Sequence, residues 1–86
     1  MRWNCVYVDK VRRFSLEIEE ESGRTFVSIP VYNGMVEYEE WYEVDAQDFE
    51  RYRADPTLAF DFVERCKARQ LDHLLLLPPG RDRGWA

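Results

Sequence analysis

The chain has one histidine, two cysteines and no apolar run longer than the four residues from Leu74 to Leu77. Such a run is far too short to cross a bilayer, because a membrane-spanning helix takes about 20 apolar residues. Cys5 and Cys66 do not make a disulfide framework, and we expect both to be free thiols. No basic and apolar signal peptide opens the chain. We therefore expect a cytoplasmic protein.

Catalytic motifs are also lacking. His73 stands without a Ser, Cys or Asp constellation, so we expect a surface or boundary residue. The carboxylates do not follow the spacing of a calcium loop, and a strand would point Glu39 and Glu40 to opposite faces. We therefore expect no enzyme, no cofactor and no metal. A small enzyme using Glu40 and His73 is the least favoured alternative.

Positive charge is missing from residues 25–50, which contain no Lys or Arg. The same stretch carries seven carboxylates: Glu37, Glu39, Glu40, Glu43, Asp45, Asp48 and Glu50. Six aromatic residues lie among them: Phe26, Tyr32, Tyr38, Trp41, Tyr42 and Phe49. This stretch alone carries a charge of −7, more negative than the net charge of −5 of the whole chain, so the acidity is regional. An acidic middle argues against direct nucleic-acid binding and against anionic membrane surfaces, which both require a positive footprint.

What the chain does contain is typical of a small folded domain. Its 86 residues are 45% hydrophobic and 15% aromatic, well above the composition of disordered proteins. A chain of this size buries only about 60–65% of the surface that it exposes when unfolded. We therefore expect one domain with a modest core.

Alternating apolar residues predict strands at about 3–8, 13–20, 25–31 and 35–44. Asn33-Gly34 is a strong hairpin signal, because both residues tolerate positive φ. Pro30 cannot donate to a ladder, so its strand should lie at an edge or have a break there.

Two helices are predicted at about 46–54 and 56–70, with Asp45 and Asp55 as N-caps. The buried stripe of the second should comprise Leu58, Ala59, Phe62, Val63 and Cys66. A short covered strand at 73–77 and a tail at 78–86 complete the chain. The sequence therefore predicts an α+β fold, an antiparallel sheet of about four to five strands with two helices packed on one face.

Along the strand 35–44, alternate residues divide into two sets. The expected core set is Val36, Tyr38, Glu40, Tyr42 and Val44, in which Glu40 is a misfit. The expected solvent set is Met35, Glu37, Glu39, Trp41 and Glu43. A Trp anchor among carboxylates suits a basic protein partner, since acidic rims steer association. The predicted partner-binding residues are Glu37, Glu39, Trp41, Glu43, Asp45 and Asp48. The alternative is a solvated face whose Trp41 is covered by the N-terminal segment or by the tail.

Two further features leave alternatives open. The tail segment from Gly80 to Gly84 contains Arg81 and Arg83, which suit either phosphate binding or folding back on the acidic sheet. Phe60 falls outside the buried stripe of the second helix. It either extends the interface or packs under the tail.

Three segments resemble small acidic bacterial immunity proteins, which neutralise polymorphic or contact-delivered toxins. They are the run from Ser28 to Val44, the segment from Asp55 to Cys66 and the run from Leu77 to Gly84. Proteins of this class present acidic and aromatic groups to a cationic toxin domain, often a nuclease, and block its active site or its substrate path. The resemblance implies one tight protein partner and residence in the cytoplasm. It contains no catalytic motif.

The leading hypothesis is therefore an immunity protein that binds and inhibits a basic bacterial toxin domain, itself a monomer or a weak homodimer. In it, Glu37, Glu39 and Glu43 pair with Lys or Arg of the toxin, and Trp41 fills a pocket. The alternative is a regulatory or assembly module that binds a basic peptide or self-associates through its sheet edge.

Overall fold

The computed structural model describes residues 1–86. Four strands come first: β1 (Trp3–Asp9), β2 (Phe14–Glu19), β3 (Arg24–Tyr32) and β4 (Glu37–Val44). Two α-helices follow, α1 (Ala46–Ala54) and α2 (Phe60–Lys67). Two short 3-10 turns complete the elements, Pro56–Ala59 before α2 and Asp72–Leu74 after it.

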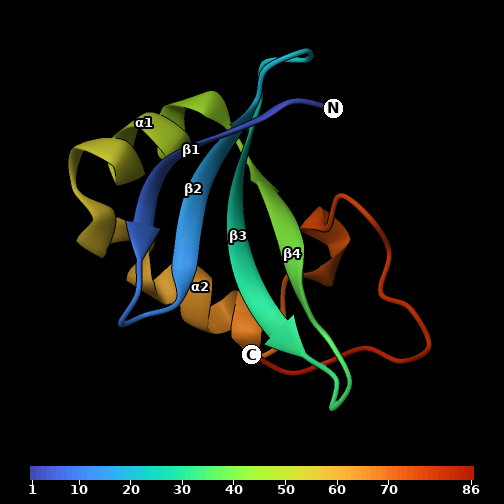
Figure 1. Ribbon diagram of the computed structural model, residues 1–86. Helices are drawn as coiled ribbons and strands as arrows, with labels where there is room; N and C mark the ends of the chain where they lie inside the picture. Colours follow the sequence, from blue (N-terminus) through green and yellow to red (C-terminus); the bar gives the residue numbers. More distant parts are fainter.

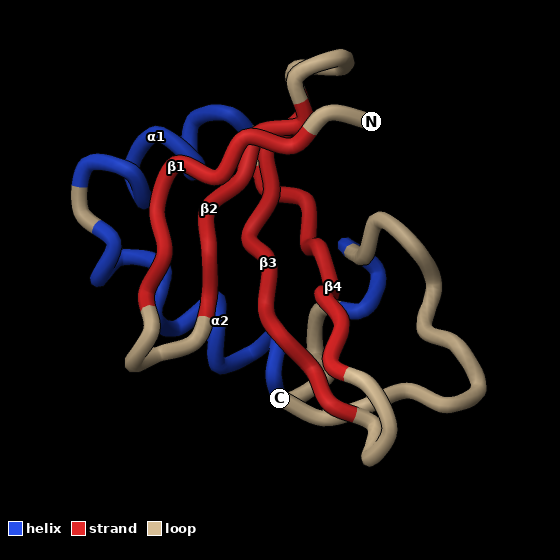
Figure 2. The backbone as a smooth tube through the Cα atoms, in the orientation of Figure 1, coloured by secondary structure: helices blue, strands red, loops and turns tan.

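The strands form one antiparallel sheet in the order β1-β2-β3-β4, with each strand paired to its neighbour in sequence. Both helices lie on one side of this sheet, and the C-terminal segment runs around the outer edge of β4 (Figure 1). The tube view shows that the segment after the second 3-10 turn forms a loop and tail (Figure 2). The predicted α+β class, with a four-stranded sheet and two packed helices, is confirmed.

The sheet side that packs against the helices is called the helical face. Leu16, Val27 and Tyr42 are neighbours across three strands and are each fully buried. Phe49 of α1 and Val63 of α2 are also fully buried and belong to the same core cluster. Burial of apolar side chains between these layers is the main stabilising term.

The turn after β2 is organised by Glu19, whose carboxylate accepts hydrogen bonds from the backbone N–H groups of Arg2, Glu21 and Ser22. These donors favour the charged form and lower the pKa of Glu19 to about 2. Glu19 therefore joins the N-terminal segment to the β2–β3 turn.

The β3–β4 hairpin forms at Asn33-Gly34 as predicted. Gly34 has φ +92°, and Asn33 Oδ1 accepts hydrogen bonds from the N–H groups of Met35 and Val36. These bonds hold Met35 and Val36 in the loop, so β4 begins at Glu37. The prediction that Val36 belongs to the core was wrong, because its side chain is 56% exposed.

Pro30 lies in a central strand, opposite Glu39 of β4. The pairing of β3 with β2 ends at Ser28. Pro30 therefore lies beyond this ladder, which loses no hydrogen bond through the missing N–H.

The predicted helix 56–70 is shorter and begins differently. Asp55 caps a 3-10 turn through the N–H of Thr57, and the α-helix starts only at Phe60. Leu58 is consequently 46% exposed, which contradicts its predicted place in the buried stripe. Phe60 packs edge-on against Phe14 and lies under the Arg12 guanidinium, away from the tail.

The predicted strand 73–77 was also wrong. Residues 72–74 form a 3-10 turn, and the only bridge within the predicted strand is an isolated one between Leu75 and Tyr42. Leu77 is 66% exposed, so this segment is not fully covered. No helix is long and apolar enough to cross a membrane.

Candidate partner-binding surface

The sheet side opposite the helices is called the open face. Four predicted residues lie together on it, because Glu37, Glu39, Trp41 and Glu43 are alternate residues of β4. Their cross-strand neighbours on β3 include Phe26, opposite Glu43, and Ser28, opposite Trp41. No helix covers this side of the sheet (Figure 1).

An aromatic stack occupies the open face. The Trp3 ring of β1 stacks on the Trp41 ring with centroids 5.0 Å apart and planes 11° from parallel. Trp3 also meets Phe26 edge-on at 5.2 Å, and Phe26 is fully buried on a face without helices. Trp41 is thus half-buried, and the N-terminal strand covers part of it, as in the alternative stated above. The stack presents one wide aromatic surface rather than a lone indole.

Most of the clustered carboxylates have cationic partners. Glu43 receives two hydrogen bonds from Arg24, at 3.0 and 2.6 Å, which lower its pKa. Glu37 pairs with Arg13 at 3.5 Å. Both arginines lie outside residues 25–50 in the sequence and reach the carboxylates through the sheet. The acidic stretch is therefore less uncompensated than its sequence implies.

Glu39 is different, because no Lys or Arg nitrogen lies within 4 Å of it among the ion pairs of the structure. Partial burial raises the pKa of Glu39, and the charges of Glu17 and Glu37 raise it further, while Arg13 opposes them. Glu17, on β2, accepts hydrogen bonds from the Ser28 hydroxyl and, at 3.2 Å, from Trp41 Nε1. The open face thus combines an aromatic stack with two carboxylates, Glu17 and Glu39, that lack a cation.

Asp45 and Asp48 do not belong to this face. Asp45 Oδ1 accepts a hydrogen bond of 2.7 Å from the Asp48 N–H and so caps α1, as predicted. The Asp48 carboxylate pairs with Arg51 at 3.0 Å, one turn further along the helix. Both residues lie past the end of β4, where their first role is to start the helix.

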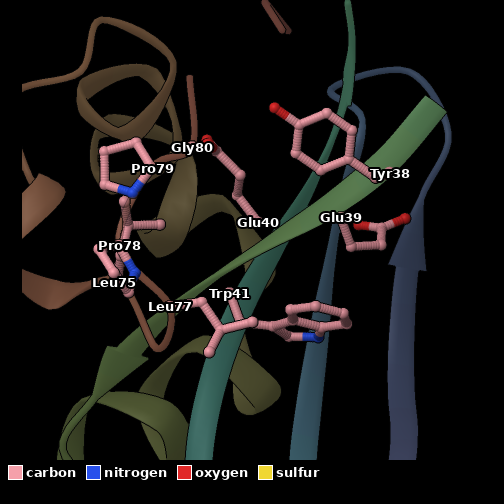
Figure 3. Close-up of a pocket in the computed structure, with 9 residues that line it drawn as sticks. All are labelled: Tyr38, Glu39, Glu40, Trp41, Leu75, Leu77, Pro78, Pro79 and Gly80. Carbon is pink, nitrogen blue, oxygen red and sulfur yellow. The ribbon is translucent and has the colours of Figure 1, made fainter. Parts of the chain in front are cut away.

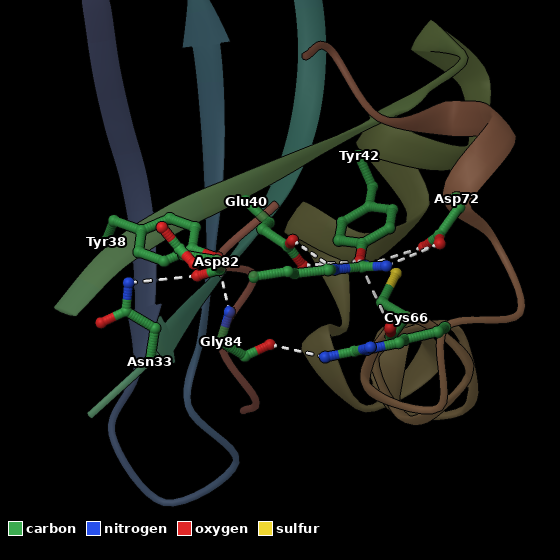
Figure 4. Close-up of polar contacts among 10 residues, drawn as sticks. Asn33, Tyr38, Glu40, Tyr42, Cys66, Asp72, Asp82 and Gly84 are labelled. Carbon is green, nitrogen blue, oxygen red and sulfur yellow. Dashed lines mark hydrogen bonds and ion pairs between the residues drawn. The ribbon is translucent and has the colours of Figure 1, made fainter. Parts of the chain in front are cut away.

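Glu40, the misfit of the core set, is explained by the tail. Its carboxylate is 8% exposed and accepts hydrogen bonds from Arg83, at 2.8 and 3.2 Å, and from the Tyr42 hydroxyl at 3.0 Å. Arg83 also pairs with Asp72 at 2.7 and 2.8 Å (Figure 4). Burial and the nearby Glu40 charge raise the pKa of Tyr42, whose hydroxyl oxygen also lies 3.3 Å from the Cys66 carbonyl oxygen. Of the two alternatives for the tail, the structure has the one in which the tail folds back on the acidic sheet.

The rest of the tail is anchored on β3 and β4. Trp85 and Tyr32 exchange two backbone hydrogen bonds of 3.0 Å, and the Arg69 guanidinium lies 3.2 Å from the centre of the Trp85 ring. The Gly84 N–H donates to the Tyr38 hydroxyl at 2.7 Å (Figure 4). Gly84 has no room for a Cβ, which would lie 2.5 Å from the Tyr32 carbonyl carbon. Residue 84 must therefore be glycine for this contact to form.

A hollow of about 150 Å³ lies between β4 and the segment from Leu75 to Gly80. Leu75, Leu77, Pro78 and Pro79 form its outer wall, while Tyr38, Glu40 and Trp41 come from β4 (Figure 3). The close-up shows Trp41 and Glu39 directed toward the neighbouring strands and Glu40 directed toward Gly80 (Figure 3). The hollow therefore lies at the edge of the open face.

Two titratable residues considered above, His73 and Cys66, do not contribute to a site. His73 is exposed, as expected of a surface residue. Cys66 is 1% exposed, and burial raises the pKa of its thiol to about 12. That thiol stays protonated at neutral pH and is a poor nucleophile. Both cysteines are free thiols, as predicted. No group of three or more His, Cys, Asp or Glu side chains is arranged to hold a metal ion.

Comparison of the chain with protein-family profiles, curated proteins and solved structures finds no match. The surface itself contains two residues that the sequence analysis did not select, Trp3 and Glu17. Each lies on the open face because of strand register, Trp3 opposite Glu19 and Glu17 opposite Phe26. The alternation within β2 could have identified Glu17. Trp3 could not be found this way, because it reaches Trp41 across two intervening strands.

Proposed function

We propose that this protein is an immunity protein that binds a basic bacterial toxin domain through the open face and so inhibits it. One observation carries the proposal: a half-buried Trp3–Trp41 stack beside Glu17 and Glu39, on a sheet face without helices. Interfaces favour aromatic anchors at their centre, and acidic rims steer basic partners. The resemblance to acidic immunity proteins supports the choice of partner.

In this proposal, the aromatic stack supplies contact area and the carboxylates steer the approach of the basic partner. Glu39 is the strongest candidate for an ion pair with the toxin, since no Lys or Arg forms an ion pair with it in the free protein. Glu37 and Glu43 already pair with Arg13 and Arg24. They would exchange these arginines for the toxin's cations or share them with the toxin, so each would add less binding free energy than Glu39. Asp45 and Asp48 would add to the steering field from the start of α1.

The first experiment is co-expression of this chain with the product of the gene immediately upstream, with growth rescue and co-purification as readouts. Glu39→Lys is expected to slow association and to flatten its dependence on salt. Glu64→Lys makes the same charge change at an exposed residue of α2, on the other layer, and is the matched control. If both variants lost toxin binding equally, the effect would come from net charge alone, and the open face would not be the binding site.

The second candidate is a regulatory or assembly module that self-associates through its sheet edge. The outer edge of β1 favours it, because nothing in the chain pairs with that side of the strand and Val8 is 54% exposed. Size in solution distinguishes the candidates. A stable homodimer broken by a Val8→Lys substitution would favour the module, and a monomer would disfavour it.

A further inference from the structure

The outer edge of β4 is paired along only part of its length. Leu75 lies opposite Tyr42, and the Leu76 N–H donates to the Trp41 carbonyl at 2.9 Å. In an antiparallel ladder, alternate residues direct both backbone groups to the same side. The backbone groups of Glu39 therefore point outward like those of Trp41.

Pro78 explains why the pairing stops. Continuing the register from Leu75 and Leu76 would place residue 78 opposite Glu39. A proline has no N–H to donate to the Glu39 carbonyl, so the ladder cannot continue there. The backbone hydrogen bonds outside the helices and strands include none from the N–H of Glu39 or Trp41. A short length of β4 edge is left open.

The hollow lies against this open length. Its outer wall is the apolar segment from Leu75 to Pro79 (Figure 3). An extended peptide that paired with β4 would direct alternate side chains toward this wall and toward the open face. The residue opposite Glu39 would share the open face with the Glu37 and Glu39 carboxylates. Charge complementarity then requires Lys or Arg at that position.

We propose that the edge of β4 from Glu37 to Glu39 binds a short extended segment of a basic partner protein by strand addition. Main-chain hydrogen bonds to Glu39 give affinity, apolar side chains meet Leu75 and Leu77, and a basic side chain meets Glu39. This inference rests on the proposed function and names the form in which the partner is recognised.

The test uses a capped Lys-Val-Lys-Val-Lys peptide and the same peptide N-methylated at its central lysine. Amide NMR spectra of the whole chain are recorded during titration with each. The first peptide is expected to shift the Glu39 and Trp41 amides saturably. N-methylation keeps every charge and removes one donor, so binding should weaken by about fivefold or more. Equal binding of the two peptides would overturn the inference.

Two substitutions and one control test the protein side. Glu39→Pro removes the outward N–H together with the charge, and its control Glu39→Gln removes only the charge, so Glu39→Pro should bind the peptide more weakly than Glu39→Gln. Pro78→Ala supplies an N–H that lets the chain itself pair with Glu39, which should close the edge and reduce peptide binding. An unchanged affinity in Pro78→Ala, with a normally folded spectrum, would contradict the proposal.

The readout separates this inference from the proposed function. Shifts confined to the Trp3 and Trp41 indole signals would leave docking on the open face intact and overturn strand addition. A toxin that fails to bind, while the peptide still shifts the Glu39 amide, would overturn the immunity function and support the edge site.

Discussion

The helical face and the open face are built from alternate residues of the same strands, yet they satisfy their polar groups in different ways. On the helical face, Glu40 is buried and receives hydrogen bonds from Arg83 and Tyr42. On the open face, its neighbour Glu39 has no ion-pair partner, and the negative charges of Glu17 and Glu37 raise its pKa. A buried carboxylate that is paired serves the fold, whereas an unpaired one beside aromatics is available to a partner.

The largest expected effect comes from breaking the buried pair on the helical face. Arg83→Ala leaves Glu40 buried without its cation, which should lower the free energy of unfolding by about 3 kcal/mol. Urea denaturation measures the loss. Arg81→Ala is the control, because Arg81 is exposed and has no ion pair. Similar stabilities for the two variants would contradict the structural role given to Arg83.

A second test asks whether the tail is held where the structure places it. Gly84→Ala would place a Cβ against the Tyr32 backbone, so the tail must shift at an expected cost of about 1–3 kcal/mol. Gly80→Ala meets nothing within 4 Å and should be nearly neutral. Thermal unfolding of the two variants measures the difference in their stability. A neutral Gly84→Ala would mean that the tail does not lie against Tyr32 in solution.

On the open face, the test is whether Trp3 and Trp41 act as a unit. A double-mutant cycle with Trp3→Leu and Trp41→Leu should give a coupling of about 1 kcal/mol in the free energy of unfolding. Trp85→Leu, on the tail, should show no coupling to Trp41. Additive effects of Trp3 and Trp41 would show that their stacking contributes nothing beyond burial.

The smallest effects concern the titration of individual carboxylates, followed by NMR of their carboxyl carbons. As pH falls, Glu39 should protonate before Glu43, because the pKa of Glu39 is raised and Arg24 lowers the pKa of Glu43. Glu19 should protonate last, with a pKa of about 2. Since that pKa is below its ordinary value of 4.5, the stability from Glu19 is complete above pH 4.5 and is lost as pH falls toward 2. Glu19→Gln should flatten this dependence, and a reversed order for Glu39 and Glu43 would contradict the charge arrangement.

Local signals in the sequence were sufficient for much of the fold. Period-2 alternation indicated four strands, Asn33-Gly34 indicated the hairpin, and Asp45 indicated the start of α1. The predicted strand at 73–77 failed, because residues 72–74 form a 3-10 turn and only Leu75 and Leu76 pair with β4, which an apolar run does not reveal. The helix 56–70 was too long, because Asp55-Pro56 starts a 3-10 turn as readily as an α-helix.

The candidate surface was less predictable, because its chemistry depends on contacts between distant residues. Alternation placed Glu37, Glu39, Trp41 and Glu43 on one face. The cations Arg13 and Arg24 and the second indole, Trp3, reach that face only through strand register. The role of Glu40 depended on Arg83, 43 residues away. No local pattern contains such pairings.

The most direct test of the central claim is co-purification of this chain with the upstream gene product, comparing the parent with Glu39→Lys and Glu64→Lys. Binding through the open face predicts that the parent and Glu64→Lys retain the partner and rescue growth, while Glu39→Lys associates more slowly and rescues poorly. Equal retention by all three proteins would contradict the assignment of the open face as the partner-binding surface.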